Sequence, residues 1–163
     1  MSSIAEAFSN YAKMPAQQDE TLNVVKITKL ALDIFNEDYI EFYSEEDEII
    51  AKFDRTQLIR VVTNLVKNGI QAIEQEKPEN PLIKVTVSSE EKYVSIRIAD
   101  NGTGISETNK AKIFEPKFTT KSSGMGLGLA MVKNIVETYN GTIDLDSEEG
   151  KGATFTVRFL RQL

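Results

Sequence analysis

Asp100-Asn101-Gly102-Thr103-Gly104-Ile105 is the stretch that decides the fold, and a second glycine-rich stretch, Gly124-Met125-Gly126-Leu127-Gly128-Leu129, follows it. The first stretch comes directly after a strand-like run and places a carboxylate beside a sharp backbone turn. The second opens a predicted helix, whose unpaired N–H groups and dipole favour a phosphate group. Together the two stretches predict a nucleotide site, in which the first contacts the base and the second the phosphates.

Alternating apolar and polar residues on either side of these loops predict a sheet. Residues 83–88 and 93–99 alternate around a turn at 89–92, as half-buried antiparallel strands do, and this hairpin leads directly to Asp100. The other predicted strands are residues 39–43 and 49–53, which flank an acidic turn, and residues 142–147 and 153–159.

Two helices are predicted to cover this sheet. The first begins after the N-cap Asp54 and runs to about Gln75, and the second covers residues 127–139 and ends at the Asn140-Gly141 signal. We therefore expect an α/β (α+β) fold, a two-layer sandwich of a mixed, mostly antiparallel sheet packed on helices.

The first 36 residues indicate two helical pieces broken at Pro15. The break predicts a domain boundary, with residues 1–20 outside the main unit and residues 21–163 inside it. Phe8 and Tyr11 form an apolar stripe on the first piece. Two interpretations of this stripe stay open, because it can pack against a partner helix that the chain lacks or fold back on the domain.

The composition fits one soluble domain and excludes several classes of protein. With 163 residues, 40% of them hydrophobic, the chain can form a single domain with its own core. Its net charge of −6 argues against a nucleic-acid surface, and its lack of cysteine excludes disulfides and thiolate metal sites. No stretch resembles a membrane span or a signal sequence. We expect a cytoplasmic piece, compatible with a parent protein anchored in the inner membrane.

The segment between the two glycine stretches, residues 106–123, has no clear period. It contains Pro116, a Ser-Ser-Gly exit and four lysines, at positions 110, 112, 117 and 121. This composition predicts a mobile, locally basic lid.

Five motifs in this order resemble the ATP-binding domain of sensor histidine kinases in the GHKL superfamily, which also includes type II topoisomerase, mismatch-repair and heat-shock-90 ATPases. The resemblance covers roughly residues 37–160. The motifs are an asparagine box at 64–69, a first glycine box at 100–105, a phenylalanine box at 114–121, a second glycine box at 124–129, and the terminal Gly152-Ala153-Thr154-Phe155. The lid and residues 8–15 are most similar to kinases of the nitrogen-regulation type. The resemblance implies the Bergerat-type ATP-binding fold.

The resemblance also implies ATP and Mg²⁺ as cofactors and assigns residues to them. Asp100 would accept a hydrogen bond from the adenine amine, where guanine carries a carbonyl. Asn68 would be the Mg²⁺ ligand, supported by Asn64, because an amide oxygen suits this ion. Phosphate charge would be neutralised by Lys67 or by lid lysines, of which Lys121 is the best placed by its motif. Asn64, Asn68 and Lys121 would be the catalytic residues. The remaining binding residues would be Gln71, Gly102, Gly104, Ile105, Thr120, Gly124, Met125, Gly126, Leu127, Gly128, Leu129 and Thr154.

Simpler interpretations of these residues stay open. Asp100 can be an ordinary turn aspartate, Asn64 and Asn68 a solvated helix face, and Thr154 an ordinary strand threonine. Phe114 and Phe118 can be lid anchors, core residues or both, and Leu127 and Leu129 suit a core better than a ligand contact. Two positions depart from the family pattern: Gln71 stands where many relatives have a basic residue, and Lys117 where many have an aromatic one.

Asn64 bears on the type of reaction. Resembling ATPases and serine-directed kinases carry a glutamate at this position as a general base, and an amide cannot take that proton. The resemblance therefore favours a histidine kinase, which transfers the γ-phosphate to an imidazole that is already nucleophilic. A GHKL-type ATPase and a nucleotide-switched binding module remain as alternatives.

The chain contains no histidine, so no histidine of this chain receives the phosphoryl group. The resemblance implies an acceptor histidine on a preceding dimerisation domain, of which residues 1–20 would be a remnant. The implied partners are ATP, that dimerisation domain and a response regulator, with no nucleic acid. We expect a homodimeric parent, a monomeric fragment, and no autophosphorylation by the fragment alone.

Overall fold

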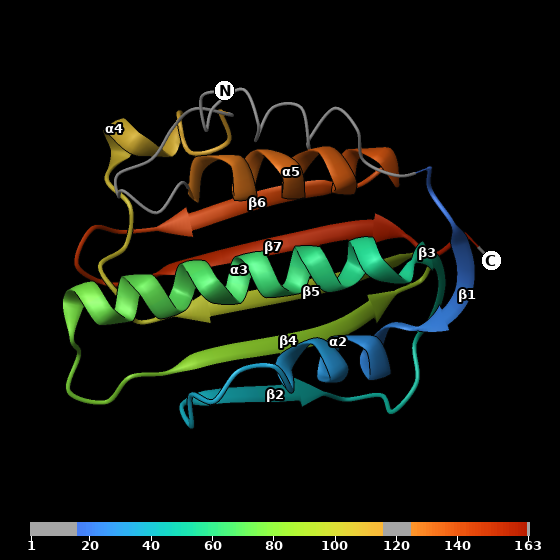
Figure 1. Cartoon of the computed structure of the whole chain (residues 1–163), viewed down its shortest axis with the longest axis horizontal. Coiled ribbons are helices and arrows are strands. Elements are labelled where there is room, and N and C mark those ends of the chain that lie inside the picture. The colour runs from blue at the N-terminus through green and yellow to red at the C-terminus, as the bar shows by residue number, and fades with distance from the viewer. Residues whose placement is uncertain (1–15, 116–124, 163) are drawn as a thin grey trace, which may run out of the picture.

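The computed structural model describes residues 16–115 and 125–162 of the chain. Helix α3 (Arg55–Glu76) runs along the middle of the molecule (Figure 1). It begins as predicted, because the Asp54 carboxylate accepts the N–H of Gln57 at 3.1 Å. It ends at Lys77, which has a left-handed backbone (φ 54°) and donates its N–H to the Ile73 carbonyl.

The main sheet has five strands in the order β2-β4-β5-β7-β6. The strands are β2 (Ile40–Ser44), β4 (Ile83–Glu90), β5 (Tyr93–Asp100), β6 (Thr142–Ser147) and β7 (Ala153–Leu160). The β4–β5 hairpin is antiparallel as predicted, with Ile83 opposite Asp100. Only β2 and β4 pair in parallel within this sheet, so the prediction of a mixed, mostly antiparallel sheet is confirmed.

Helices α2 (Val24–Leu32), α3 and α5 (Met125–Thr138) all cover one face of this sheet, as Figure 1 shows. Alternate strand residues on that face are buried, as in β5, where Val94, Ile96 and Ile98 are inaccessible to solvent. The other face carries polar side chains, including Lys84 and Arg158 over the rings of Tyr43 and Tyr93. The predicted two-layer sandwich is therefore confirmed.

The N-terminal part of the described chain differs from the prediction. Residues 19–23 form a strand, β1 (Asp19–Asn23), which pairs with β3 (Ile50–Asp54) in a separate two-stranded sheet. The predicted strands around the acidic turn therefore lie in different sheets. Helix α2 starts at Val24, where the Asn23 side chain accepts the Val25 N–H, and stops at Leu32. Polar β1 has no clear alternation, which is why the sequence pattern missed it.

The predicted boundary between residues 20 and 21 cuts through β1, because Asp19 and Glu20 pair with β3. The break at Pro15 and the stripe of Phe8 and Tyr11 lie outside the described residues. Within residues 16–115 and 125–162, no helix is long and apolar enough to cross a membrane.

Tyr139 joins three parts of the fold at the C-terminal end of α5. Its ring is buried and stacks on Phe53, with centroids 3.7 Å apart. Its hydroxyl accepts the N–H of Asp54 at 2.9 Å and donates to the carboxylate of Asp19. Burial, and then this hydrogen bond to Asp19, raise the pKa of Tyr139 above its usual value. Strand β1, the start of α3 and the end of α5 are thereby held together.

The predicted end of α5 is confirmed. Asn140 has a left-handed backbone (φ 57°), and the N–H groups of Asn140 and Gly141 reach back to the carbonyls of Glu137 and Val136. This is the Schellman arrangement.

Candidate nucleotide site

Helix α3 supplies the polar stripe of the candidate site. Asn64, Asn68 and Gln71 are half-buried at spacings that place them on one side of the helix. The Asn64 amide nitrogen donates to the Arg60 carbonyl at 2.8 Å. This bond orients the amide so that its oxygen points away from the backbone of its own helix.

Asp100 lies at the end of β5, on the same sheet side as buried Ile98 and hence toward the helices. Its carboxylate accepts the N–H of Gly102 at 2.8 Å. Gly69 brings α3 close to this residue, since a Cβ at Gly69 would lie 3.4 Å from the Asp100 Cβ and 3.1 Å from Ile83. Because Gly69 follows Asn68, the predicted metal ligand and the predicted adenine hook lie in one region.

The first glycine box packs directly on the backbone of α3. A Cβ at Gly102 would lie 2.5 Å from the backbone of Ala72, whose carbonyl accepts the Thr103 N–H at 3.2 Å. Gly104 has a φ of 72°, so the expected positive φ is confirmed at this residue. A Cβ at Gly104 would also lie 2.2 Å from the Glu148 carbonyl oxygen. At Gly102 the requirement for glycine comes from the close approach instead.

The second glycine box opens a helix, as predicted, because α5 begins at Met125. Gly128 lies next to the polar stripe of α3, because a Cβ at this position would be 2.9 Å from the Asn64 side-chain oxygen. Leu129 is buried in the core, in agreement with a packing role.

Several predicted residues are not covered by these contacts. Met125, Gly126 and Leu127 lie in the first turn of α5. Residues 116–124 lie outside the described part of the chain, and they include Lys117, Phe118, Thr120, Lys121 and Gly124.

Thr154 is not brought together with the other predicted residues. In β7 the buried side chains are those of Ala153, Phe155, Val157 and Phe159, so Thr154 lies on the opposite, polar face of the sheet. The residue beside Asp100 in the ladder is Ala153. The expectation that Thr154 contacts adenine is therefore wrong for a site on the Asp100 side, because strand side chains alternate between faces.

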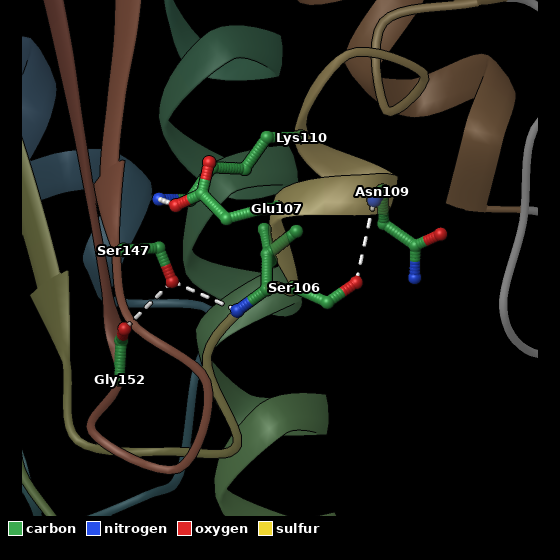
Figure 2. Close-up of polar contacts among 7 residues, drawn as sticks. Ser106, Glu107, Asn109, Lys110, Ser147 and Gly152 are labelled. Carbon is green, nitrogen blue, oxygen red and sulfur yellow. Dashed lines mark hydrogen bonds and ion pairs between the residues drawn. The ribbon is translucent and has the colours of Figure 1, made fainter.

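The described start of the predicted lid is more ordered than its sequence suggested. Ser106 caps a short helix, α4 (Glu107–Lys110), by accepting the N–H of Asn109, and Glu107 pairs with Lys110 at 2.7 Å (Figure 2). Phe114 meets Phe155 edge to face, with centroids 6.4 Å apart. The predicted anchoring of this segment on the domain is confirmed at Phe114.

Ser147, at the end of β6, joins the first glycine box to the turn before β7. Its buried hydroxyl accepts the Ile105 N–H at 2.8 Å and donates to the Gly152 carbonyl at 2.8 Å (Figure 2). Ile105 itself packs against the core. The end of the first glycine box is thus fixed both by a hydrogen bond and by apolar contact.

Three further residues shape the site but carry no predicted role. Gly69 and Ala72 are small residues that let α3 lie close to β5 and to the first glycine box. Small residues next to Asn68 and Gln71 in the sequence could have indicated this close packing. Asn101 bonds through its side chain to the N–H of Leu82 and the carbonyl of Asn80, which fixes the loop before β4. An asparagine after a strand is a known signal for such bonds.

The donor set is compatible with Mg²⁺ held mainly by a nucleotide. Among the described residues, no group of three or more acidic, histidine or cysteine side chains could hold a metal ion. The expected ligand, Asn68, is half-buried on α3, and one amide oxygen fits an ion that takes most of its coordination from phosphate oxygens and water.

A separate cavity of about 610 Å³ lies between α2 and β2, lined by residues that include Lys29, Asp33 and Phe42. None of the predicted nucleotide residues lines it.

Residues 53–163 match the protein family described as histidine kinase-, DNA gyrase B- and HSP90-like ATPase. The sensor histidine kinase ZraS of Escherichia coli K12 is 48% identical over 104 residues, which cover 64% of this chain and 22% of ZraS. The nitrogen regulation protein NtrY of Azorhizobium caulinodans is 33% identical over 157 residues, which cover 92% of this chain and 20% of NtrY. The chain spans about a fifth of the length of these relatives.

Among solved structures, the catalytic domain of the histidine kinase ThkA aligns with a TM-score of 0.77 at 28% identity, covering 89% of this chain and 97% of that domain. A structure of ThkA in complex with the response regulator protein TrrA aligns with a TM-score of 0.80 at 26% identity, covering 98% of this chain and 47% of that one. The predicted fold class is that of these catalytic domains.

Proposed function

Because this chain belongs to the family of histidine kinase-, DNA gyrase B- and HSP90-like ATPases, as its motifs predicted, we propose that it is the ATP-binding catalytic domain of a sensor histidine kinase. The observation that carries this proposal is the convergence on α3. One helix holds Asn64 against Gly128 of the second glycine box and packs beside Asp100 and Gly102 of the first. Motifs far apart in sequence thereby form one site.

In this proposal Asp100 holds the adenine amine, and the first turn of α5 receives the phosphates. The Asp100 carboxylate accepts the Gly102 N–H at 2.8 Å, and this bond holds it at the end of β5 as an acceptor for the adenine amine. The first N–H groups of a helix have no partner within the helix, and its dipole favours negative charge there, so the start of α5 suits phosphate. Asn68 would hold Mg²⁺, and Lys121 would neutralise charge on the transferred group.

Position 64 supports a kinase rather than an ATPase. The Asn64 amide cannot act as a general base, and its nitrogen is engaged with the Arg60 carbonyl. A hydrolytic reaction would lack a base here to activate water. An imidazole needs no such base at neutral pH, so the protein's work would be positioning and charge neutralisation.

The acceptor in this proposal is a histidine of another domain, since the chain has no histidine. A dimerisation domain of the parent protein would present it, and a response regulator would receive the phosphoryl group next. The complex of ThkA with TrrA supports the second partner. We propose a homodimeric parent and a monomeric fragment in the cytoplasm.

The test is a transfer assay in trans. The chain is mixed with Mg²⁺, radiolabelled ATP and a separate histidine-bearing dimerisation domain of the parent protein. We expect acid-labile label on the histidine domain and none on this chain. Release of free phosphate without transfer would indicate an ATPase, and nucleotide binding without either reaction would indicate a switch module. Stable label on this chain would also contradict the proposal.

A further inference from the structure

The hydroxyl of Ser147 is the side-chain link between the β6–β7 turn and the first glycine box. It is buried, with 7% of the residue exposed, and it bonds at 2.8 Å to both the Ile105 N–H and the Gly152 carbonyl (Figure 2). Both partners are backbone groups, so the Ser147 hydroxyl joins two segments of backbone to each other. We propose that Ser147 is a positioning residue for nucleotide binding, which sets the path of the backbone after Asp100; this inference rests on the proposed function.

The two backbones that Ser147 joins are in direct contact. A Cβ at Gly104 would lie 2.2 Å from the Glu148 carbonyl oxygen, and a Cβ at Gly152 would lie 2.1 Å from the Asp100 carbonyl oxygen. The Gly150 N–H donates to the Thr103 carbonyl at 2.5 Å. The β6–β7 turn therefore packs directly against the first glycine box. The Ser147 hydroxyl adds a hydrogen bond at the end of this contact, at Ile105.

Ser147 acts on the site through the backbone on both sides of Ile105. Toward the N-terminus, the box leads back to Gly102, whose N–H bonds to the Asp100 carboxylate. Toward the C-terminus, the next residue is Ser106, the N-cap of α4. The hydroxyl thus fixes the backbone between these two points, and we expect its effect on nucleotide binding to pass through the Asp100 side.

Removing the hydroxyl affects its two partners unequally. The Gly152 carbonyl keeps a second donor, the Glu148 N–H, at 3.4 Å. The Ile105 N–H loses the acceptor that the structure shows for it, and an unpaired buried N–H is costly. Ser147→Ala should therefore release the glycine box at Ile105 while the β6–β7 turn stays in place.

The experiment measures two properties of the full chain in Ser147→Ala. Hydrogen exchange of the Ile105 amide without nucleotide tests the hydrogen bond alone. Calorimetry with ADP and Mg²⁺, at a temperature where thermal unfolding shows the variant folded, tests the effect on binding. We expect faster exchange confined to the glycine box and about tenfold weaker ADP binding, the factor that one lost buried hydrogen bond corresponds to.

Two further variants separate positioning from general stability. Ser147→Thr keeps the hydroxyl and should restore both properties. Ser106→Ala removes the cap of α4 one residue away and should leave ADP affinity unchanged. If Ser147→Ala does not fold, Ser147→Cys, with a similar volume and a weak sulfur acceptor, replaces it and should give an intermediate loss.

Unchanged ADP affinity in folded Ser147→Ala would overturn the inference, as would an equal loss in Ser106→Ala. Unchanged exchange at Ile105 would also overturn it. Failure of the wild-type chain to bind ADP would instead contradict the proposed function, and the inference would fall with it even if the exchange result held.

Discussion

Tyr139→Phe is the substitution for which the structure gives the clearest magnitude. It removes one oxygen and leaves the ring, which stays stacked on Phe53. The lost oxygen is the acceptor for the Asp54 N–H at 2.9 Å, and that buried N–H then has no partner at a cost of roughly 1–3 kcal/mol. Asp19 is exposed, and its carboxylate also accepts from the Gln17 side chain and can bond to water, so losing the hydrogen bond from Tyr139 adds little to the cost.

We therefore expect Tyr139→Phe to lower the free energy of unfolding by about 2 kcal/mol. For a domain of this size, that corresponds to a fall in Tm of about 4–8 °C. Urea unfolding followed by circular dichroism measures it, and the dependence on urea concentration should not change.

Tyr93→Phe is the matched control. Tyr93 is half-buried under Arg158, and its hydroxyl makes no hydrogen bond among the described residues. Its loss should change stability by less than about 0.5 kcal/mol. Equal effects of the two substitutions would refute the role assigned to the Tyr139 hydroxyl.

Three more predictions follow from single residues. Burial raises the pKa of Tyr139 in the native state, whereas the unfolded chain loses the Tyr139 proton above about pH 10. Wild-type stability should therefore fall with pH more steeply than that of Tyr139→Phe, by up to about 1.4 kcal/mol per pH unit. Urea midpoints that run in parallel for the two proteins from about pH 9 to 11 would contradict this. Gly102→Ala should lower the free energy of unfolding in urea by more than about 3 kcal/mol, because its Cβ would overlap the Ala72 backbone. Gly150→Ala, with φ 82° and open space around it, should lower it by about 1 kcal/mol. Equal losses in the two variants would be evidence against the close approach at Gly102. Asn68→Ala should remove the Mg²⁺ dependence of ATP binding in a titration with and without the metal, and an unchanged dependence would exclude Asn68 as the ligand.

Local signals predicted much of this fold because each depends on a few neighbouring residues. The alternation in β4 and β5 gave their pairing and led to Asp100, and Asp54 marked the start of α3. Asn140-Gly141 marked the end of α5 in the same way. Such capping and turn signals act within one turn of chain, so a single sequence displays them.

Contacts between distant segments were not predictable in this way. Strand β1 exists because β3, about thirty residues later, pairs with it, and its own residues show little pattern. Ser147 bonds to a backbone group 42 residues away and belongs to no motif. Thr154 was assigned by its motif, but the register of β7 against β5 decides which face it occupies.

The central claim is that the end of β5 and the stripe of α3 form one ATP site, and calorimetry with ATP and Mg²⁺ on Asp100→Asn tests it most directly. Loss of a hydrogen bond to a charged acceptor should weaken binding by roughly 10- to 100-fold. Asp144→Asn, the same change in charge on the outer face of β6, should leave the affinity unaltered. An Asp100→Asn variant that binds ATP as tightly as the wild type would contradict the account.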